Sequence, residues 1–463
     1  MTSESSNTDS LSFTEAVLYF VGAITFFHLA FTFTAFSFLI VGFLVCVLRL
    51  SRLQSPRRAF YVGLSIGLLS YAPQLGFFWN IFGPAAIPLW LVVSVWLALF
   101  LLLTHLAQQR LGKLSAACII PFLWLGLEYF RSELYYLRFS WFSAGYVFSS
   151  PSHGTVFGGL GVYGISFFLV VIAVLLTQRR RSLWLVGTIL FVVTIVGEIA
   201  SHAIPSNNSG PRVSGVQLEF REEDVLASLE RVREKYPKTD LYVLSEYTFA
   251  EPPPKRIKEW CRAHKTYLIA GGRDEMTTSL FYNTAFVVGP EGEIVFQQVK
   301  SVPIQFFKDG LPATKQELWN SPWGKIGICI CYDLSYRRVV DNLVAQGAQA
   351  LIVPTMDVVN WGEYQHELHA RIAPMRAAEF RIPIFRVCSS GISQLVDASG
   401  AVWARASFPG EGEIISGLLP IERPGRLPLD HWLAPFATGV TGLFILWLAV
   451  SRILRKRSQT PQT

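Results

Sequence analysis

The chain has 463 residues, of which 51% are hydrophobic, 14% aromatic and only 16% charged, and its formal net charge is +7. This composition is too apolar for an ordinary soluble protein. The apolar excess is concentrated in four stretches that contain no Asp, Glu, Lys or Arg, namely 16–48, 59–109, 139–178 and 431–451. The sequence therefore predicts a membrane protein.

Eight membrane spans are predicted, because one span needs about 20 residues. The first apolar stretch can hold two short helices. The second can hold two more, with a break expected near Gly83-Pro84 and Pro88. Four single spans complete the count, near 114–130, 157–177, 183–201 and 431–451.

Basic residues follow every even-numbered span. They are Arg49, Arg52, Arg57, Arg58, Arg110, Lys113, Arg179, Arg180, Arg181, Arg452, Arg455, Lys456 and Arg457. Lys and Arg are enriched on the cytoplasmic side of membrane proteins, so these ends are predicted to be cytoplasmic. The positive net charge is then explained by topology, and no nucleic-acid partner is expected. Residues 1–10 are polar and lack a basic region, which favours an uncleaved first span over a cleavable signal peptide.

A more polar segment separates the seventh span from the eighth. The chain is thus expected to consist of a transmembrane domain at 1–204, an extracytoplasmic domain at 211–426, and a C-terminal helix with a basic cytoplasmic tail at 427–463. Helical patterns at 221–236, 336–346 and 366–380 alternate with apolar runs typical of strands, at 213–218, 241–244, 267–271, 285–288, 325–330, 350–353 and 384–387. Such alternation predicts a layered α/β domain. Asn283 and the segments 289–292 and 397–400 are predicted to form turns.

Cys331 is the candidate nucleophile of this segment. It ends an Ile-rich run in residues 327–333 (GICICYD), so it is expected to emerge at a sheet edge, where α/β proteins place active sites. Cys329 should point to the opposite face of the strand and be inert. The six cysteines show no disulfide framework, and His264, His366 and His369 lack zinc-ligand spacing with them. No metal and no cofactor are therefore expected.

Several motifs resemble one family. Residues 124–132 (WLGLEYFRS), 141–146 (WFSAGY) and 161–167 (GVYGISF) are similar to its transmembrane part, and WG at 361–362, QH at 365–366, RAAE at 376–379, RIP at 381–383 and GIS at 391–393 are similar to the stretch after its nucleophile. This family is the apolipoprotein N-acyltransferases, the membrane branch of the nitrilase (carbon–nitrogen hydrolase) superfamily.

The resemblance implies an extracytoplasmic α-β-β-α sandwich on a helical membrane bundle, in a bacterial inner membrane. It implies a Glu-Lys-Cys triad at Glu246, Lys300 and Cys331. A membrane phospholipid would donate an acyl chain to Cys331, which would pass it to the α-amino group of the diacylglyceryl cysteine of a lipoprotein.

The sequence departs from the family pattern at three positions. Ser245 replaces the usual Pro before the catalytic Glu, and Asp333 replaces the Glu two residues after the nucleophile. Asp309 is the nearest substitute for a second essential Glu. Asp333 and the short interval between Lys300 and Cys331 resemble soluble nitrilases. A membrane-tethered amidase therefore stays open as an alternative, as does a non-catalytic paralogue that binds lipid or lipoprotein.

The chemistry of such a site assigns a role to each residue. Glu246 would be the general base for the thiol. Lys300, rather than Lys308, would stabilise the oxyanion together with the backbone N–H of Tyr332. Asp333 and Asp309 would support the site.

Trp361 and Glu379 are candidates for substrate binding. For each of these, a structural role is the alternative. Tyr332 and Trp361 would then be core aromatics, and Glu379 would pair with Arg376 or Arg381. His366 and His369 are interpreted as a structural pair.

Overall fold

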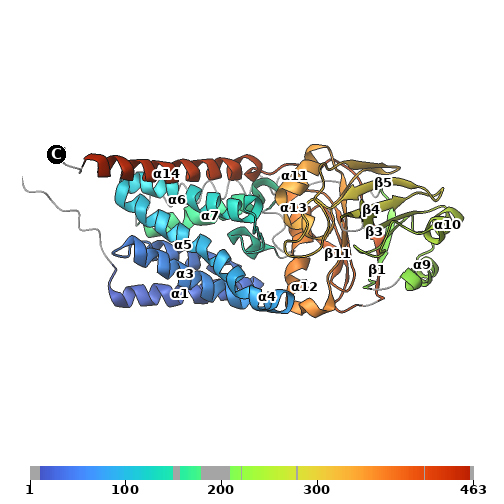
Figure 1. Cartoon of the computed structure of the whole chain (residues 1–463), viewed down its shortest axis with the longest axis horizontal. Helices are drawn as coiled ribbons and strands as arrows, with labels where there is room; N and C mark the ends of the chain where they lie inside the picture. Colours follow the sequence, from blue (N-terminus) through green and yellow to red (C-terminus); the bar gives the residue numbers. More distant parts are fainter. Residues whose placement is uncertain are drawn as a thin grey trace, which may run out of the picture. The chain divides into compact units, whose positions relative to one another are not determined.

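The computed structural model describes residues 11–149, 157–178, 209–219, 222–277, 280–410 and 412–458 (Figure 1). These residues form two compact units. The first contains the described residues of Met1–Phe148, Val162–Val196 and Leu429–Thr463, and the second those of Ser149–Gly161 and Gly197–Pro428.

The first unit is helical. Its main helices are α1 (Phe13–Thr32), α2 (Ile40–Leu50), α3 (Pro56–Gln74), α4 (Phe77–Phe82), α5 (Ala86–Arg110), α6 (Lys113–Tyr129), α7 (Phe157–Thr177) and α14 (Asp430–Ser458). Among the described residues, five helices are long and apolar enough to cross a membrane: Phe13–Thr32, Phe77–Arg110, Lys113–Leu134, Phe157–Thr177 and Asp430–Leu454. A shorter apolar helix covers Thr34–Leu50.

Local sequence explains where these helices begin and how they pack. Ser12 starts α1 with a capping box, in which its hydroxyl accepts from Glu15 N at 3.2 Å and Glu15 Oε2 accepts from Ser12 N at 2.9 Å. Helices α3 and α5 approach closely at Gly63 and Gly67. A Cβ at Gly63 would lie 2.8 Å from the Ala98 Cα, so only glycine permits this contact.

The second apolar stretch has two interruptions, and the prediction included only the one near Gly83. Helix α3 contains Pro73 and ends at Gln74, where Leu75 N closes the last turn by donating to Tyr71 O at 2.8 Å. Pro88 lies in the first turn of α5, where an N–H has no helical partner and proline is tolerated. Gly83, with φ of 57°, makes the expected bend, here between α4 and the short turn before α5. The seventh predicted span, at 183–201, lies outside the described residues, so the count of eight stays a prediction.

The second unit contains two six-stranded sheets. The first has the order β12-β1-β2-β3-β4-β5 and the second β11-β10-β9-β8-β7-β6. The strands are β1 (Arg212–Val216), β2 (Leu241–Val243), β3 (Tyr267–Glu275), β4 (Phe281–Val288), β5 (Ile294–Val299), β6 (Leu318–Ser321), β7 (Gly324–Ile328), β8 (Ala350–Thr355), β9 (Ile384–Cys388), β10 (Ser393–Val396), β11 (Val402–Ala406) and β12 (Ile414–Leu418). Each sheet has three central parallel strands, β1-β2-β3 and β7-β8-β9, with antiparallel strands outside them.

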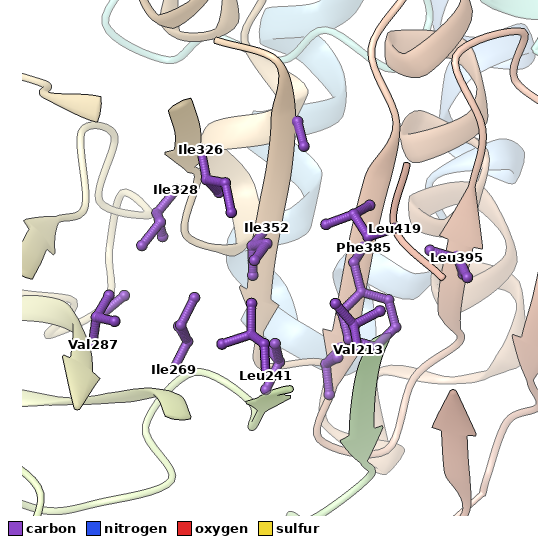
Figure 2. Close-up of a cluster of buried hydrophobic side chains, with 14 of the residues drawn as sticks. Val213, Leu241, Ile269, Val287, Ile326, Ile328, Ile352, Phe385, Leu395 and Leu419 are labelled. Atoms are coloured by element: carbon purple, nitrogen blue, oxygen red, sulfur yellow. The ribbon is translucent and has the colours of Figure 1, made fainter. Parts of the chain in front are cut away.

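The core of this unit lies between the two sheets. Side chains from the first sheet, such as Val213 and Leu241, face side chains from the second, such as Ile352 and Phe385 (Figure 2). Helices α9 (Glu222–Lys235) and α10 (Lys255–His264) pack on the outside of the first sheet. Helices α11 (Arg337–Ala345) and α13 (Ile372–Phe380) pack against strands of the second, and α12 (Glu363–Ala370) precedes α13. The predicted layered α/β fold is confirmed.

The turn predicted at Asn283 is wrong. Asn283 lies inside β4 and pairs with Arg273 of β3, because the antiparallel ladder continues as far as Phe281. The other two predicted turns are confirmed: Gly292 N donates to Gly289 O between β4 and β5, and Gly400 N donates to Asp397 O between β10 and β11.

Candidate active site

Each residue of the predicted triad lies just after the end of a strand. Glu246 follows β2, Lys300 directly follows β5, and Cys331 follows β7. All three side chains are buried, with exposed fractions of 3%, 0% and 2%. Lys308 is exposed. The structure thus brings Lys300, not Lys308, to the glutamate.

Lys300 lies between two carboxylates. Its Nζ is 2.8 Å from Glu246 Oε1 and 2.7 Å from Asp309 Oδ2. The Asn283 amide donates to the same two groups, at 2.6 Å to Glu246 Oε1 and 2.9 Å to Asp309 Oδ1. Asp309 also accepts from the Tyr247 hydroxyl at 2.8 Å and from Ile304 N at 2.7 Å. One ammonium and one amide therefore hold two acidic groups together.

Cys331 has an uncommon backbone conformation. Its φ is 50°, in the left-handed region that non-glycine residues rarely occupy, and it begins the short 3₁₀ turn Cys331–Ser335. The Cys331 Sγ lies 3.7 Å from the Met356 carbonyl oxygen. The Met356 N–H donates to Glu246 Oε2 at 2.9 Å. The same residue therefore contacts both the thiol and the carboxylate.

Asp333 ties the cysteine turn to the chain after Lys300. Its carboxylate accepts from Val302 N at 2.7 Å, from Ser301 N at 3.0 Å and from Ile330 N at 3.2 Å. Burial raises the pKa of this carboxyl to about 6, although these N–H groups oppose the rise. Asp333 thus fixes the spacing between Lys300 and Cys331.

Burial and neighbouring charges set the protonation states. Burial raises the pKa of Glu246, with Lys300 opposing. Burial lowers the pKa of Lys300, but the carboxylates of Glu246 and Asp309 raise it well above its usual value. The pKa of Asp309 is lowered, because Lys300 and its hydrogen bonds outweigh burial. Burial and the Glu246 charge raise the pKa of the Cys331 thiol well above its usual value. Burial and charge thus favour the protonated forms of Lys300 and Cys331 and raise the basicity of Glu246.

Two predicted aromatic residues, Tyr332 and Trp361, are only partly buried. Tyr332 is half-buried and packs edge-on against Tyr336, with ring centroids 4.9 Å apart. Trp361 is half-buried, and its ring centroid lies 6.4 Å from that of Phe307, in the loop between Lys300 and Asp309.

Glu379 makes the ion pair that its structural alternative predicts, with Arg376. It is fully buried. Arg376 in turn donates to the carbonyl oxygens of Leu334 at 3.1 Å and Ser335 at 2.8 Å. The pair thereby supports the turn that begins at Cys331. Cys329 is also buried, and its N–H donates to Ile352 O in the sheet.

Sequence reasoning missed several contacts of this site. Asn283 is fully buried within an apolar strand, and a polar residue at such a position was the available signal. The contribution of Met356 comes from its backbone and has no sequence signal. Asp357 and His369 also lie near the thiol, and possible ligand atoms of Cys331, Asp357 and His369 lie within 4.8 Å of one another. This set fits a metal ion poorly, because Asp357 is already bonded to Arg386 and His369 at 2.6 and 2.8 Å.

Comparisons with known proteins identify the class and then the family. A carbon–nitrogen hydrolase domain matches residues 241–423 and an apolipoprotein N-acyltransferase N-terminal domain matches residues 21–175. An apolipoprotein N-acyltransferase of Geobacter metallireducens is 25% identical over 414 residues, covering 75% of this chain and 79% of that protein. An omega-amidase of Xenopus laevis is 27% identical over 173 residues, covering 34% of this chain and 62% of that protein. A carbon–nitrogen hydrolase structure from Helicobacter pylori has 20% identity and a TM-score of 0.40, and the match covers 45% of this chain and 88% of that one.

The second unit thus carries a domain of the carbon–nitrogen hydrolase, or nitrilase, superfamily. Because the N-terminal domain match precedes it on the same chain, the protein belongs to the apolipoprotein N-acyltransferase family of that superfamily.

Proposed function

We propose that this protein transfers an acyl chain from a membrane phospholipid to the α-amino group of the diacylglyceryl cysteine of a lipoprotein, through a thioester on Cys331. The observation that carries the proposal is the buried arrangement in which Glu246 and Lys300 are in direct contact and the backbone of Met356 contacts both Glu246 and the Cys331 thiol. The family membership supports acyl transfer to a lipoprotein amine.

In the first half-reaction, Glu246 takes the proton of the Cys331 thiol while the sulfur attacks the ester carbonyl of the phospholipid. The raised thiol pKa means that a free thiolate is costly, so proton transfer accompanies attack. Lys300 and the Tyr332 N–H stabilise the oxyanion. The carbon–oxygen ester bond then breaks, and the lysophospholipid leaves with the proton from Glu246.

In the second half-reaction, the α-amino group attacks the thioester carbonyl and gives a proton to Glu246. The carbon–sulfur bond breaks, an amide forms, and the sulfur of Cys331 regains a proton. Asp309 contributes by keeping Lys300 charged, and Asp333 by holding the chain after Lys300 against the cysteine turn. Trp361 and Phe307 are proposed to contact substrate.

The protein is proposed to be a multi-pass protein of a bacterial inner membrane, with its second unit on the extracytoplasmic side. The apolar helices of the first unit and the basic residues after alternate predicted spans support this arrangement. The proposed donor is then available in the same bilayer.

A membrane-tethered amidase is the second candidate. Asp333 and the similarity to omega-amidases favour it, and water would then replace the amine in the second half-reaction. A transfer assay separates the two. The full-length protein is reconstituted with phospholipid that has one isotope-labelled acyl chain, and a synthetic peptide with an N-terminal diacylglyceryl cysteine is added.

The proposal expects the labelled chain on the peptide amine, and no transfer to a matched peptide whose amine is acetylated. Cys331→Ala should abolish transfer, whereas Cys329→Ala should retain most of it. Release of labelled fatty acid without peptide acylation would favour the hydrolase, and neither product would favour a binding paralogue.

A further inference from the structure

The chain directly after β8 contacts both proposed reacting groups. Met356 N donates to Glu246 Oε2 at 2.9 Å, and Met356 O lies 3.7 Å from the Cys331 Sγ. A displacement of this backbone would therefore change both contacts at once. Whatever holds Met356 in place thus controls the geometry of the base and of the nucleophile.

The backbone of Asp357, the next residue, is held by two serines. Asp357 N donates to Ser389 Oγ at 3.0 Å, and the same hydroxyl donates back to Asp357 O at 3.0 Å. Ser390 Oγ also donates to Asp357 O, at 2.7 Å. On the other side of Met356, Thr355 O accepts from Ser389 N at 3.0 Å. Met356 is thus fixed between two residues that are anchored to the chain after β9.

The Asp357 side chain adds a charged anchor. Arg386 Nη2 donates to Asp357 Oδ2 at 2.6 Å, and His369 Nδ1 lies 2.8 Å from Asp357 Oδ1. Arg386 also donates to the Ile392 carbonyl oxygen at 2.6 Å. Burial raises the pKa of Asp357, but His369 and Arg386 outweigh it, and the pKa lies well below its usual value. The carboxylate stays ionised although it is fully buried.

The packing around this carboxylate is close. A Cβ at Gly391 would lie 2.7 Å from both the Cβ and the Oδ2 of Asp357, so only glycine fits there. Burying a charge is costly unless the charge is paired and hydrogen-bonded. If the position of Asp357 only had to be packed, an apolar side chain would therefore be expected there. A charged anchor directly beside the thiol suggests a role in the geometry of the reaction.

We propose that Asp357 is a positioning residue whose carboxylate, anchored by Arg386 and His369, fixes the Met356 backbone and thereby holds Glu246 and Cys331 in reacting geometry. This inference rests on the proposed roles of Glu246 and Cys331. His369 Nδ1 lies within hydrogen-bond distance of both the Asp357 carboxylate and Arg386 Nη2, at 2.8 and 3.0 Å. Burial lowers the pKa of His369, which disfavours the charged form.

Four variants of the full-length protein test the proposal. Asp357→Asn removes the charge, and Ser389→Ala removes the two bonds to the Asp357 backbone. His369→Asn keeps an N–H donor near the position of Nδ1 but removes the titrating ring. Ser214→Ala is the matched control, because Ser214 is fully buried in β1 and its hydroxyl contacts Thr239 and Ser416, not the site.

The first measurement is the single-turnover rate at which a defined phospholipid acylates Cys331. The rate constant should fall about a hundredfold in Asp357→Asn and about tenfold in Ser389→Ala, because a displacement of about 1 Å at a reacting group has effects of this size. The lipid concentration that gives half-maximal rate should not change. His369→Asn should stay within about threefold of wild type, and Ser214→Ala should be unaffected.

The second measurement does not need acyl transfer. Iodoacetamide modification of Cys331 is followed against pH by mass spectrometry of its peptide. The charges that face this thiol are Glu246, Lys300, Asp357 and Arg386, with His369 as the further titratable group. Loss of the Asp357 charge leaves Arg386 uncompensated, so the midpoint should move to lower pH in Asp357→Asn and stay in place in Ser214→Ala.

Acylation within twofold of wild type in both Asp357→Asn and Ser389→Ala would overturn the proposal. An alkylation midpoint in Asp357→Asn equal to that of wild type would also overturn it, because the Asp357 charge would then not act on the thiol. If Asp357→Asn does not fold, the acylation rate of Ser389→Ala tests the proposal instead. Absence of any adduct in wild type would refute the proposed function instead, and the alkylation midpoint would still test the link between Asp357 and the thiol.

Discussion

Replacing Lys300 by Arg separates a catalytic role from simple attraction of anionic lipid. Lys300 is 0% exposed, and its Nζ fits between carboxylate oxygens at 2.8 and 2.7 Å. Arg keeps the charge but spreads it over a larger planar group that cannot occupy the same point. We therefore expect Lys300→Arg to fail nearly as badly as Lys300→Ala.

The magnitude follows from two losses. A misplaced oxyanion donor costs about 10²- to 10³-fold in rate. Breaking a buried ion pair costs about 3–5 kcal/mol of stability, because the carboxylates of Glu246 and Asp309 are left without their cation. Attraction of anionic lipid, by contrast, is worth about 1 kcal/mol per basic residue, and Arg would supply it equally well.

The assay is single-turnover acylation of Cys331, with thermal unfolding measured on the same samples. Lys308→Arg is the matched control, because Lys308 is exposed and lies in the same loop. We expect the control to behave like wild type. Nearly full acylation in Lys300→Arg would refute the reasoning and would point to lipid attraction, which Arg supplies equally well.

Asp333→Asn should change how stability depends on pH. The folded pKa of about 6 lies above the usual Asp value of 3.8, so the stability that this group contributes is present at low pH and lost as pH rises toward 6, by about 3 kcal/mol. Melting curves from pH 4 to 7 should show this trend in wild type and a smaller one in the variant; equal trends would exclude Asp333 as its source. Asn283→Leu should cost about 3 kcal/mol and slow acylation, since two buried carboxylates lose a donor; wild-type stability and rate would contradict the bridging role. A reporter fused after Ile204 should be extracytoplasmic and one after Arg457 cytoplasmic, and finding both on one side would refute the eight-span prediction.

Sequence patterns predicted the layered architecture because strand and helix periodicity are local properties. The apolar runs that end before Glu246 and Cys331 are strands, and the strand ends bring these residues toward Lys300. The interruption at Gly83 was predicted, whereas the one after Gln74 was missed, because a proline has different effects at a helix start and in a helix interior. Pro88 lies in a first turn, whereas Pro73 precedes a helix end.

The remaining contacts depend on how the sheets pack. Asn283 was interpreted as a turn from its residue type alone, yet its strand position places its amide between two carboxylates. Asp357 lies 26 residues after Cys331, and its partner Arg386 lies a further 29 residues on. No local pattern joins such residues, because their proximity arises from the pairing of β7, β8 and β9.

The central claim is that Cys331 carries the acyl chain between donor and acceptor. The most direct test is mass spectrometry of the purified full-length protein after incubation with a phospholipid of known acyl composition. We expect a mass increase of one acyl chain on the peptide that contains Cys331. The adduct should be labile to hydroxylamine and discharged by a diacylglyceryl-cysteine peptide. An acyl chain found on another residue, or transfer to the peptide with no adduct at Cys331 at any time, would contradict the account.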